Sequence, residues 1–396
     1  MHAQAEHPPG APHGRTSYEV ADVVRLCGEA FARAYPLDSE QRRVLRDVEA
    51  CRTPVLGGHL DVCEACGESR PSYNSCRNRH CPKCQALRQA RWITERERRV
   101  LPTHHFHVVF TLPAQLRAVC RRHRRTVFDM LFACAAGTLL DLGRDPERLG
   151  VQLAVTAVLH TWKRDLGWHP HLHCIVSGGG FDVCRDQWVA SSRRFLFPVL
   201  VMGELFRGKM LAALRRALEQ GEISIGDLDP ESFFAKLYST KWIVYAKRPF
   251  GGAEQVIRYL GRYTHRVAIS NARIEDVSTD GVRFRTKAGQ RVTLAPEEFL
   301  RRFLLHVLPK GFTKIRHFGL LAASNVNGRL ERARALLTTT PPSVQPASLA
   351  PRTWEETMIA LLGVDPLVCP RCRARAIVRR PLPRTAPATP MPTDTS

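Results

Sequence analysis

The spacing of apolar residues predicts two helices near the start of the chain. In the first, apolar positions recur at every third or fourth residue, at Val20, Val24, Cys27 and Phe31. This spacing places the four side chains on one face of a helix. A second helix is expected after Asp38, with Leu45 and Val48 on its apolar face. The preceding residues 1–16 are rich in Pro, His and Gly, so we expect a flexible N-terminus there.

Apolar patterns in the middle of the chain alternate between short runs typical of strands and longer runs typical of helices. Strands are predicted at 106–112, 151–160, 171–177 and 241–247. Helices are predicted at 114–142, 198–220 and 252–264. The order is β-α-β-β-α-β-α, and its first six members fit a ferredoxin-like sheet with helices on one face. The sequence therefore predicts an α+β fold.

The charge of the chain indicates a polyanionic partner. Lys and Arg total 59 of 396 residues against 37 Asp and Glu, which gives a formal net charge of +22. Such a surplus favours nucleic acid as the partner, ahead of an anionic membrane. The hydrophobic content of 44% is that of a globular protein, and no run of about 18 apolar residues predicts a membrane span.

The 13 cysteines raise the question of whether the protein works in a reducing or an oxidising cellular compartment. The first residues are polar and lack the apolar segment of an export signal. We therefore expect reduced thiols and metal sites rather than disulfides, in a cytoplasmic protein.

Cysteines between residues 51 and 84 have the spacing of zinc ligands. Two pairs, each with two residues between the thiols, are formed by Cys63, Cys66, Cys81 and Cys84. Tetrahedral Zn²⁺ takes four soft ligands, so we predict one closed, structural zinc site on these four. A second zinc site is left open, with the candidate ligands Cys51, His59, Cys76 and His80. A redox dithiol or simply buried cysteines are the competing interpretations.

Two further features accompany this cluster. The interleaved Arg77, Arg79 and Lys83 suit contact with phosphate, although a solvated basic face has the same pattern. Far along the chain, Cys369 and Cys372 form another pair with two residues between them. This pair is either half of a zinc site completed elsewhere or no metal site, because a zinc site needs four ligands.

Histidines alternate with other residues at 169–173. On a strand, alternate residues share a face, so His171 and His173 point together. His160 lies on the preceding strand, and it comes opposite the start of the next strand if the two pair antiparallel. Three imidazoles so placed can hold one divalent ion. The alternative is that each is an ordinary core or surface histidine.

Tyr259 and Tyr263 are four residues apart on the predicted helix 252–264 and share one of its faces. An isolated pair of this kind is usually part of a core. Here the neighbours Arg258, Arg262 and Arg266 are basic, which favours a role in chemistry.

Together these motifs resemble the HUH tyrosine transposases of bacterial rolling-circle insertion sequences, the two-tyrosine type with an N-terminal zinc-binding domain. The matching segments are 75–84, 159–162, 169–173, 259–266, 303–312 and 315–316. The resemblance covers about residues 20–337 and implies an HUH catalytic sheet acting on single-stranded DNA at the ends of a mobile element. It also implies a catalytic Mg²⁺ or Mn²⁺ besides the structural Zn²⁺.

The implied chemistry agrees with the residues. A metal on His171, His173 and His160 would bind the scissile phosphate, and Tyr259 or Tyr263 would attack it to give a 5′-phosphotyrosine. Arg262 lies between the tyrosines in sequence and is a candidate for neutralising transition-state charge. The bond energy is retained, so no nucleotide or other small-molecule cofactor is expected. Three alternatives stay open: a related HUH replication initiator or relaxase, a non-catalytic zinc-finger DNA-binding protein, and a nuclease that uses water.

These assignments divide the chain into four parts. We expect a flexible N-terminus at 1–16 and a helical, zinc-binding, DNA-contacting domain at 17–100. The catalytic domain is expected at 101–337, followed by a mostly flexible tail, rich in Pro and Arg, at 338–396.

Overall fold

The computed structural model places most of the chain in two compact units. The described residues are 18–85, 88–89, 92–93, 99–250, 268–286, 289–338, 353, 355–356, 358–359, 363 and 365–385. The N-terminal unit comprises Met1–Ala90, Ile269–Leu304 and Val344–Ser396, and the sheet unit comprises Arg91–Ala268 and Leu305–Ser343. The segment 1–16, for which flexibility was expected, lies outside the described residues.

The N-terminal unit begins with the two helices that the sequence predicted, α1 (Val20–Ala34) and α2 (Ser39–Ala50). The Asp38 carboxylate accepts from the Gln41 backbone N–H at 2.8 Å, and the Gln41 side chain accepts from the Asp38 N–H at 3.1 Å. This reciprocal capping box fixes the start of α2. Val20 and Phe31 of α1 are buried, as the helical spacing required.

Two small antiparallel sheets complete this unit. The first has the order β12-β1-β2 and contains β1 (Gly58–Cys63), β2 (Ser69–Tyr73) and β12 (Ile377–Leu382). The second has the order β10-β9-β8 and contains β8 (Ile274–Val277), β9 (Val282–Arg285) and β10 (Arg291–Leu294), followed by α9 (Pro296–Leu305). Short 3-10 turns, η1 (Pro54–Leu56) and η3 (Asn271–Arg273), precede β1 and β8.

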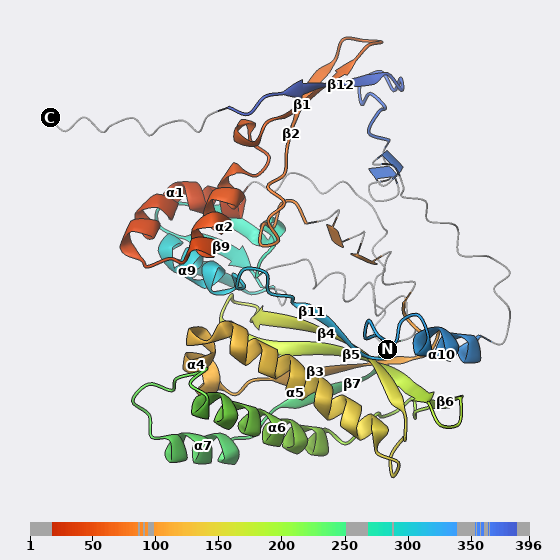
Figure 1. Cartoon of the computed structure of the whole chain (residues 1–396). Helices are drawn as coiled ribbons and strands as arrows, with labels where there is room; N and C mark the ends of the chain where they lie inside the picture. Colours follow the sequence, from red (N-terminus) through yellow and green to blue (C-terminus); the bar gives the residue numbers. More distant parts are fainter. Residues whose placement is uncertain are drawn as a thin grey trace. The chain divides into compact units, whose positions relative to one another are not determined.

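The division of the chain differs from the expected one in two places. Residues 269–304 were assigned to the catalytic domain, yet they belong to the N-terminal unit. The Val20 N–H donates to Asn271 Oδ1 at 3.2 Å, and Gln41 Nε2 donates to the Leu304 carbonyl at 3.3 Å. The tail was expected to be mostly flexible, whereas β12 forms a continuous antiparallel ladder with β1 (Figure 1).

The sheet unit is built on one antiparallel sheet with the order β11-β4-β5-β3-β7, to which β6 adds beside β5. Its strands are β3 (His105–Thr111), β4 (Gln152–Trp162), β5 (Trp168–Asp182), β6 (Gln187–Ala190), β7 (Val244–Phe250) and β11 (Ile315–Gly319). Its helices are η2 (Ala114–Leu116), α4 (Arg117–Arg122), α5 (Arg124–Arg144), α6 (Val199–Glu219), α7 (Pro230–Ser239) and α10 (Arg329–Leu337). The order β7-β3-β5-β4 of the first four long strands is that of a ferredoxin-like fold, so the predicted α+β class is confirmed.

Helices α5 and α6 cover one face of this sheet (Figure 1). Val108, Leu159 and Leu172 point into the core that these helices close, together with Phe128 of α5 and Phe206 of α6. Because side chains alternate along a strand, the residues between them point to the opposite face. The opposite face carries the histidines of β3, β4 and β5.

Among the described helices, α5 alone is long and apolar enough to cross a membrane by length and composition. Its apolar window is 61% buried inside the protein, where it packs on α6 and β4. It is therefore the central core helix of the sheet unit.

The core between α6 and the sheet predicts a large difference between two substitutions on the same helix. Phe206 is fully buried and contacts the rings of Phe110 and Trp242 edge-on, at centroid distances of 4.9 and 5.4 Å. We expect Phe206→Ala to lower the free energy of unfolding by about 3–5 kcal/mol. Leu200→Ala is the control, because this side chain is 72% exposed, and it should cost no more than about 0.5 kcal/mol. Urea unfolding of the two variants would measure both values, and similar losses would contradict the assigned core.

Candidate metal centres and catalytic face

Three histidines converge on the open face of the sheet. In the antiparallel register, His160 of β4 lies directly opposite His171 of β5, and Val158 lies opposite His173. The ligand nitrogens of His160, His171 and His173 all lie within 4.8 Å of one another. The structure thus brings together the three histidines that the sequence analysis proposed as ligands of one divalent ion.

The imidazoles are oriented so that ring nitrogens face a common point. His171 Nε2 lies 3.1 Å from His173 Nε2, and the rings of His160 and His173 are 4.3 Å apart between centroids. His171 Nδ1 donates to the His169 carbonyl at 2.7 Å, which leaves the Nε2 lone pair of His171 directed at His173. Two ligand nitrogens bound about 2.1 Å from one metal lie roughly 3 Å apart, so the spacing fits an ion between them.

A fourth histidine, His107 of β3, supports this arrangement and was missed by the sequence analysis. His107 Nε2 lies 2.7 Å from His173 Nδ1, and the two rings stack at 5.0 Å. With His173 donating through Nδ1, its Nε2 presents a lone pair to the same point as that of His171. Hydrogen bonds of this kind fix the orientation of a metal-binding imidazole. The signal was present in the sequence, since His107 falls in the predicted strand 106–112 and follows His105 by two residues, as His173 follows His171.

Burial favours the neutral imidazole of His107 and of His171, and the neutral form is the one that binds a metal or accepts a hydrogen bond. His160 is 2% exposed and His107 is 3% exposed. Desolvation by burial lowers the pKa of His171, and it lowers the pKa of His107 to about 4. His171 therefore needs to lose no proton near neutral pH before it binds a cation, and the neutral His107 can accept the hydrogen bond from His173.

The surroundings of the three histidines are aromatic and basic. The ring of Trp162 stacks on His160 at 4.7 Å, and Lys314 Nζ lies 5.8 Å from the Trp162 centroid. Lys247 of β7 pairs with His107 across the sheet and is exposed. This combination of basic side chains and a half-buried aromatic ring suits a nucleic-acid strand.

His306 forms hydrogen bonds with Thr161 and Leu166 that hold the turn between β4 and β5. It belongs to the segment 303–312 that resembles the transposases, but it lies outside the histidine cluster. Its Nδ1 lies 3.1 Å from Thr161 Oγ1, and its Nε2 donates to the Leu166 carbonyl at 3.0 Å. Burial lowers the pKa of His306 to about 4, so it acts here as a neutral positioning residue. One of its contacts is with Thr161, the residue next to His160.

The candidate nucleophiles cannot be placed by the same means. Tyr259, Arg262 and Tyr263 follow β7 in the sequence and lie outside the described residues. Their role as nucleophiles and as a charge-neutralising arginine therefore stays a proposal.

The cysteines group differently from the predicted set. One cluster contains Cys51, Cys76, Cys81 and Cys84, and the other contains Cys63, Cys66, Cys369 and Cys372. The predicted site on Cys63, Cys66, Cys81 and Cys84 is thus divided between two clusters. The reason is the β1–β2 hairpin, which carries Cys63 and Cys66 to its tip, whereas the chain after β2 returns to Cys51 at the end of α2.

The two histidines proposed for a second zinc site lie in neither cluster. His59 Nε2 lies 3.7 Å from Asp61 Oδ1, and His80 Nδ1 lies 3.1 Å from Asn78 Oδ1. Of the basic residues expected to contact phosphate, Lys83 forms an ion pair with Glu19 at 2.5 Å, so its charge is engaged within this unit.

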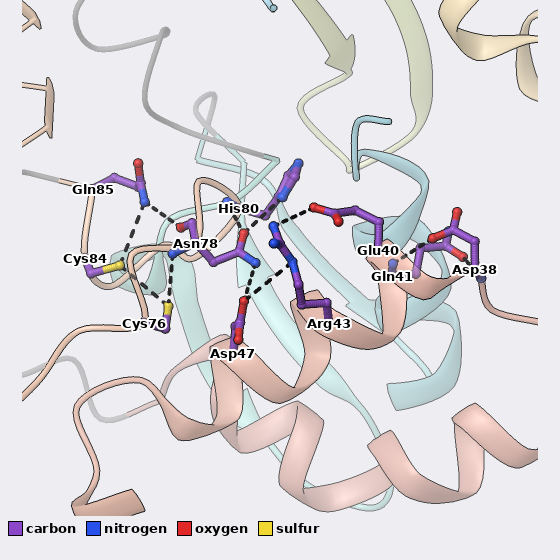
Figure 2. A network of polar contacts seen from close by, with 10 residues as sticks. All are labelled: Asp38, Glu40, Gln41, Arg43, Asp47, Cys76, Asn78, His80, Cys84 and Gln85. Atoms are coloured by element: carbon purple, nitrogen blue, oxygen red, sulfur yellow. Dashed lines mark hydrogen bonds and ion pairs between the residues drawn. The ribbon is translucent and has the colours of Figure 1, made fainter. Parts of the chain in front are cut away.

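Hydrogen bonds orient thiols of the cluster of Cys51, Cys76, Cys81 and Cys84, and Figure 2 shows those around Cys76 and Cys84. The separation of the Cys76 and Cys84 sulfurs is 3.7 Å, which matches the edge of a tetrahedral ZnS₄ site, about 3.8 Å. The N–H groups of Cys76 and Asn78 point at the sulfurs of Cys51 and Cys76, each at 3.5 Å. Donors of this kind stabilise the negative charge of metal-bound thiolates.

Asn78 is the centre of this network. Its Nδ2 donates to Asp47 Oδ2 at 2.7 Å, and its Oδ1 accepts from the His80 N–H at 2.9 Å (Figure 2). Gln85 Nε2 donates to the Asn78 carbonyl at 2.6 Å and reaches Cys84 Sγ at 3.8 Å. Asn78 thereby ties the cysteine loop to α2.

Comparison with known proteins finds two family models and curated relatives that match this chain. A family described as "Putative transposase" matches residues 154–328, and one described as "Transposase zinc-binding domain" matches residues 23–112. The chain is 43% identical over 373 residues to "Putative transposase y4qJ" of Sinorhizobium fredii, covering 90% of this chain and 94% of the relative. It is 29% identical over 357 residues to the "Transposase for insertion sequence element IS801" of Pseudomonas savastanoi pv. phaseolicola, covering 84% of each. No solved structure matches the chain.

The Asn78 network predicts the zinc affinity of the first cluster. We expect Asn78→Ala to weaken zinc binding there by about 10–100-fold, because it removes groups that orient the ligand loop. Asn74→Ala is the matched control, since Asn74 is an exposed residue of the same loop and its side chain donates to the Leu56 carbonyl, away from the cysteines. Competition with a zinc-binding dye would measure both affinities. Equal affinities in the two variants would contradict the role of Asn78.

The histidine cluster predicts a Mn²⁺ site that depends on particular imidazoles. We expect His171→Ala to lower Mn²⁺ affinity by at least tenfold, because it removes one of three converging nitrogens. His59→Ala should leave the affinity unchanged, because His59 lies in the N-terminal unit and outside both cysteine clusters. Electron paramagnetic resonance of free Mn²⁺ during titration measures the binding. Unchanged binding in His171→Ala would refute the site.

Proposed function

This chain belongs to the family of insertion-sequence transposases with an N-terminal zinc-binding domain, and we propose that it cuts and rejoins single-stranded DNA by tyrosine transesterification. The observation that carries the proposal is the convergence of His160, His171 and His173 on the open sheet face. The family supports DNA as the substrate. The histidine face supports metal-assisted phosphoryl transfer as the reaction.

The residues of the sheet would bind and orient the scissile phosphate. A divalent ion on the three histidines, Mg²⁺ or Mn²⁺, would act as a Lewis acid on that phosphate. His107 and the His169 carbonyl hold the imidazoles of His173 and His171 in the orientation that ligands need. Lys247 and Lys314 would attract the neighbouring backbone phosphates.

The proposed covalent step uses Tyr259 or Tyr263. The phenolic oxygen forms a bond to phosphorus and loses its proton, while the bond from phosphorus to the 3′ oxygen breaks and that oxygen takes up a proton. The products are a 5′-phosphotyrosine and a free 3′-OH. Since one phosphoester replaces another, the reverse reaction rejoins DNA without a nucleotide cofactor. Two tyrosines allow two strands to be handled in alternation, and Arg262 would neutralise charge in the transition state.

The proposal extends to partner and location. A net charge of +22 supports binding to a polyanion, and single-stranded DNA at the ends of the mobile element is the proposed substrate. We place the protein in the bacterial cytoplasm, associated with the nucleoid. The cysteine cluster around Cys51 would hold a structural Zn²⁺, since its four ligands leave no coordination position for substrate.

The test is covalent capture of labelled single-stranded DNA that contains the flanks of the gene, in the presence of Mn²⁺. The mechanism leaves the protein on the 5′ phosphate of the fragment downstream of the break, and the upstream fragment ends in a free 3′-OH. A 3′-end label should therefore migrate with the protein on a denaturing gel, and a 5′-end label should appear as a free shortened strand.

We expect the double variant Tyr259→Phe/Tyr263→Phe and the variant His171→Ala to lose the covalent band. Tyr238→Phe should keep it, because Tyr238 is 62% exposed on α7, whose buried residues join the core on the helix-covered face of the sheet. Cleavage that survives in the double variant would indicate a nuclease that uses water. Binding without cleavage would indicate a zinc-finger DNA-binding protein. Covalent cleavage only at a replication or transfer origin would identify an HUH initiator or relaxase.

A further inference from the structure

The second cysteine cluster joins two distant parts of the chain. Cys63 and Cys66 lie at the tip of the β1–β2 hairpin, whereas Cys369 and Cys372 come shortly before β12. We propose that these four thiolates bind a second structural Zn²⁺, as a zinc ribbon that fastens residues 365–385 to the N-terminal unit. The zinc-binding family match covers residues 23–112 and therefore contains only half of this ligand set.

The sulfur positions fit one tetrahedral ion. Cys63 Sγ lies 3.6 Å from Cys372 Sγ, and Cys66 Sγ lies 3.8 Å from Cys369 Sγ. With Zn–S bonds of about 2.3 Å, the edge of a ZnS₄ tetrahedron is about 3.8 Å. A disulfide would bring two sulfurs to about 2.05 Å, which none of these pairs approaches.

The two halves of the site have the same local backbone, which is a second and independent observation. In each, the residue after the second cysteine has a positive φ, 73° at Gly67 and 63° at Arg373. In each, that residue donates its N–H to the carbonyl of the first cysteine, at 2.8 Å to Cys63 and 3.0 Å to Cys369.

The match continues one residue further. The Cys63 N–H donates to the Glu68 carbonyl at 2.9 Å, and the Cys369 N–H donates to the Ala374 carbonyl at 2.8 Å. Two segments of different sequence therefore form the same turn. At Arg373 the turn even imposes a left-handed conformation that a β-carbon disfavours. A tight turn between paired thiols is what allows both sulfurs to face one ion.

The sheet that carries these thiols has no apolar core of its own. No residue of β2 or β12 is buried, and the buried residues of β1 are Asp61 and Cys63. Asp61 forms an ion pair with Arg379, its direct cross-strand partner, whose Nε donates to Asp61 Oδ1 at 2.8 Å. Small sheets without a hydrophobic core need a metal or a disulfide to be stable. The four thiols supply the site for such a metal.

The test counts zinc in the full-length protein by mass spectrometry of the metal content. We expect two zinc ions per chain in the unmodified protein and one in Cys369→Ser/Cys372→Ser. Cys184→Ser is the control and should keep both, because Cys184 is exposed and belongs to neither cluster.

Two further measurements distinguish loss of a ligand from general misfolding. Cys372→His should keep both ions, because imidazole can replace one thiolate, whereas Cys372→Ser should not. In Cys369→Ser/Cys372→Ser, amide hydrogen exchange of β1 and β12 should be at least tenfold faster, with the exchange of β4 and β5 unchanged.

Three results would overturn the proposal. They are a single zinc ion in the unmodified protein, two zinc ions in Cys369→Ser/Cys372→Ser, and iron in place of zinc at this site. Each outcome is independent of DNA cleavage, so the proposed function can fail while this inference holds, and the reverse.

Discussion

The register between β4 and β5 determines which side chains reach the open face of the sheet and which enter its core. His160 lies opposite His171, and Leu159 lies opposite Leu172, so histidines and leucines are sorted to opposite faces. A slip by one residue would turn the imidazoles toward Phe128 and Phe206 and expose the leucines. The hydrophobic core on one face therefore fixes the position of the ligand atoms on the other. His306 adds to this constraint by binding both arms of the turn that joins the two strands.

The two units are stabilised in different ways. The sheet unit buries a large aromatic and aliphatic core between one layer of helices and the sheet. The N-terminal unit is assembled from three segments of chain, and its sheet β12-β1-β2 has almost no apolar interior. The cluster of Cys63, Cys66, Cys369 and Cys372 lies at this sheet, where that interior is missing. Removal of metal is therefore expected to loosen the N-terminal unit far more than the sheet unit.

The arrangement of the three histidines could be predicted from the sequence because it follows from the alternation of side chains along strands. Alternation at 169–173 places His171 and His173 on one face, and a tight antiparallel turn brings His160 to them. His107 was missed because its role depends on which strand β3 pairs with, and strand order is a long-range property. The same limit explains the wrong grouping of the cysteines. Ligand spacing is local, but the partner of Cys63 turned out to lie 309 residues away, at Cys372.

The position of β12 near the end of the chain determines when the N-terminal unit can finish folding during synthesis. A ribosome releases the N-terminus first, so a unit made only of early residues can fold while the rest is still being translated. The N-terminal unit does not have that option, because β1 stays without its β12 partner until residues 377–382 have left the ribosome. The hydrogen bonds from Val20 of α1 to Asn271 and from Gln41 of α2 to Leu304 likewise form only after those later residues have been made. A chain that stops early, by a nonsense codon or by proteolysis near its end, would therefore carry the complete histidine sheet while the N-terminal unit remains unfinished.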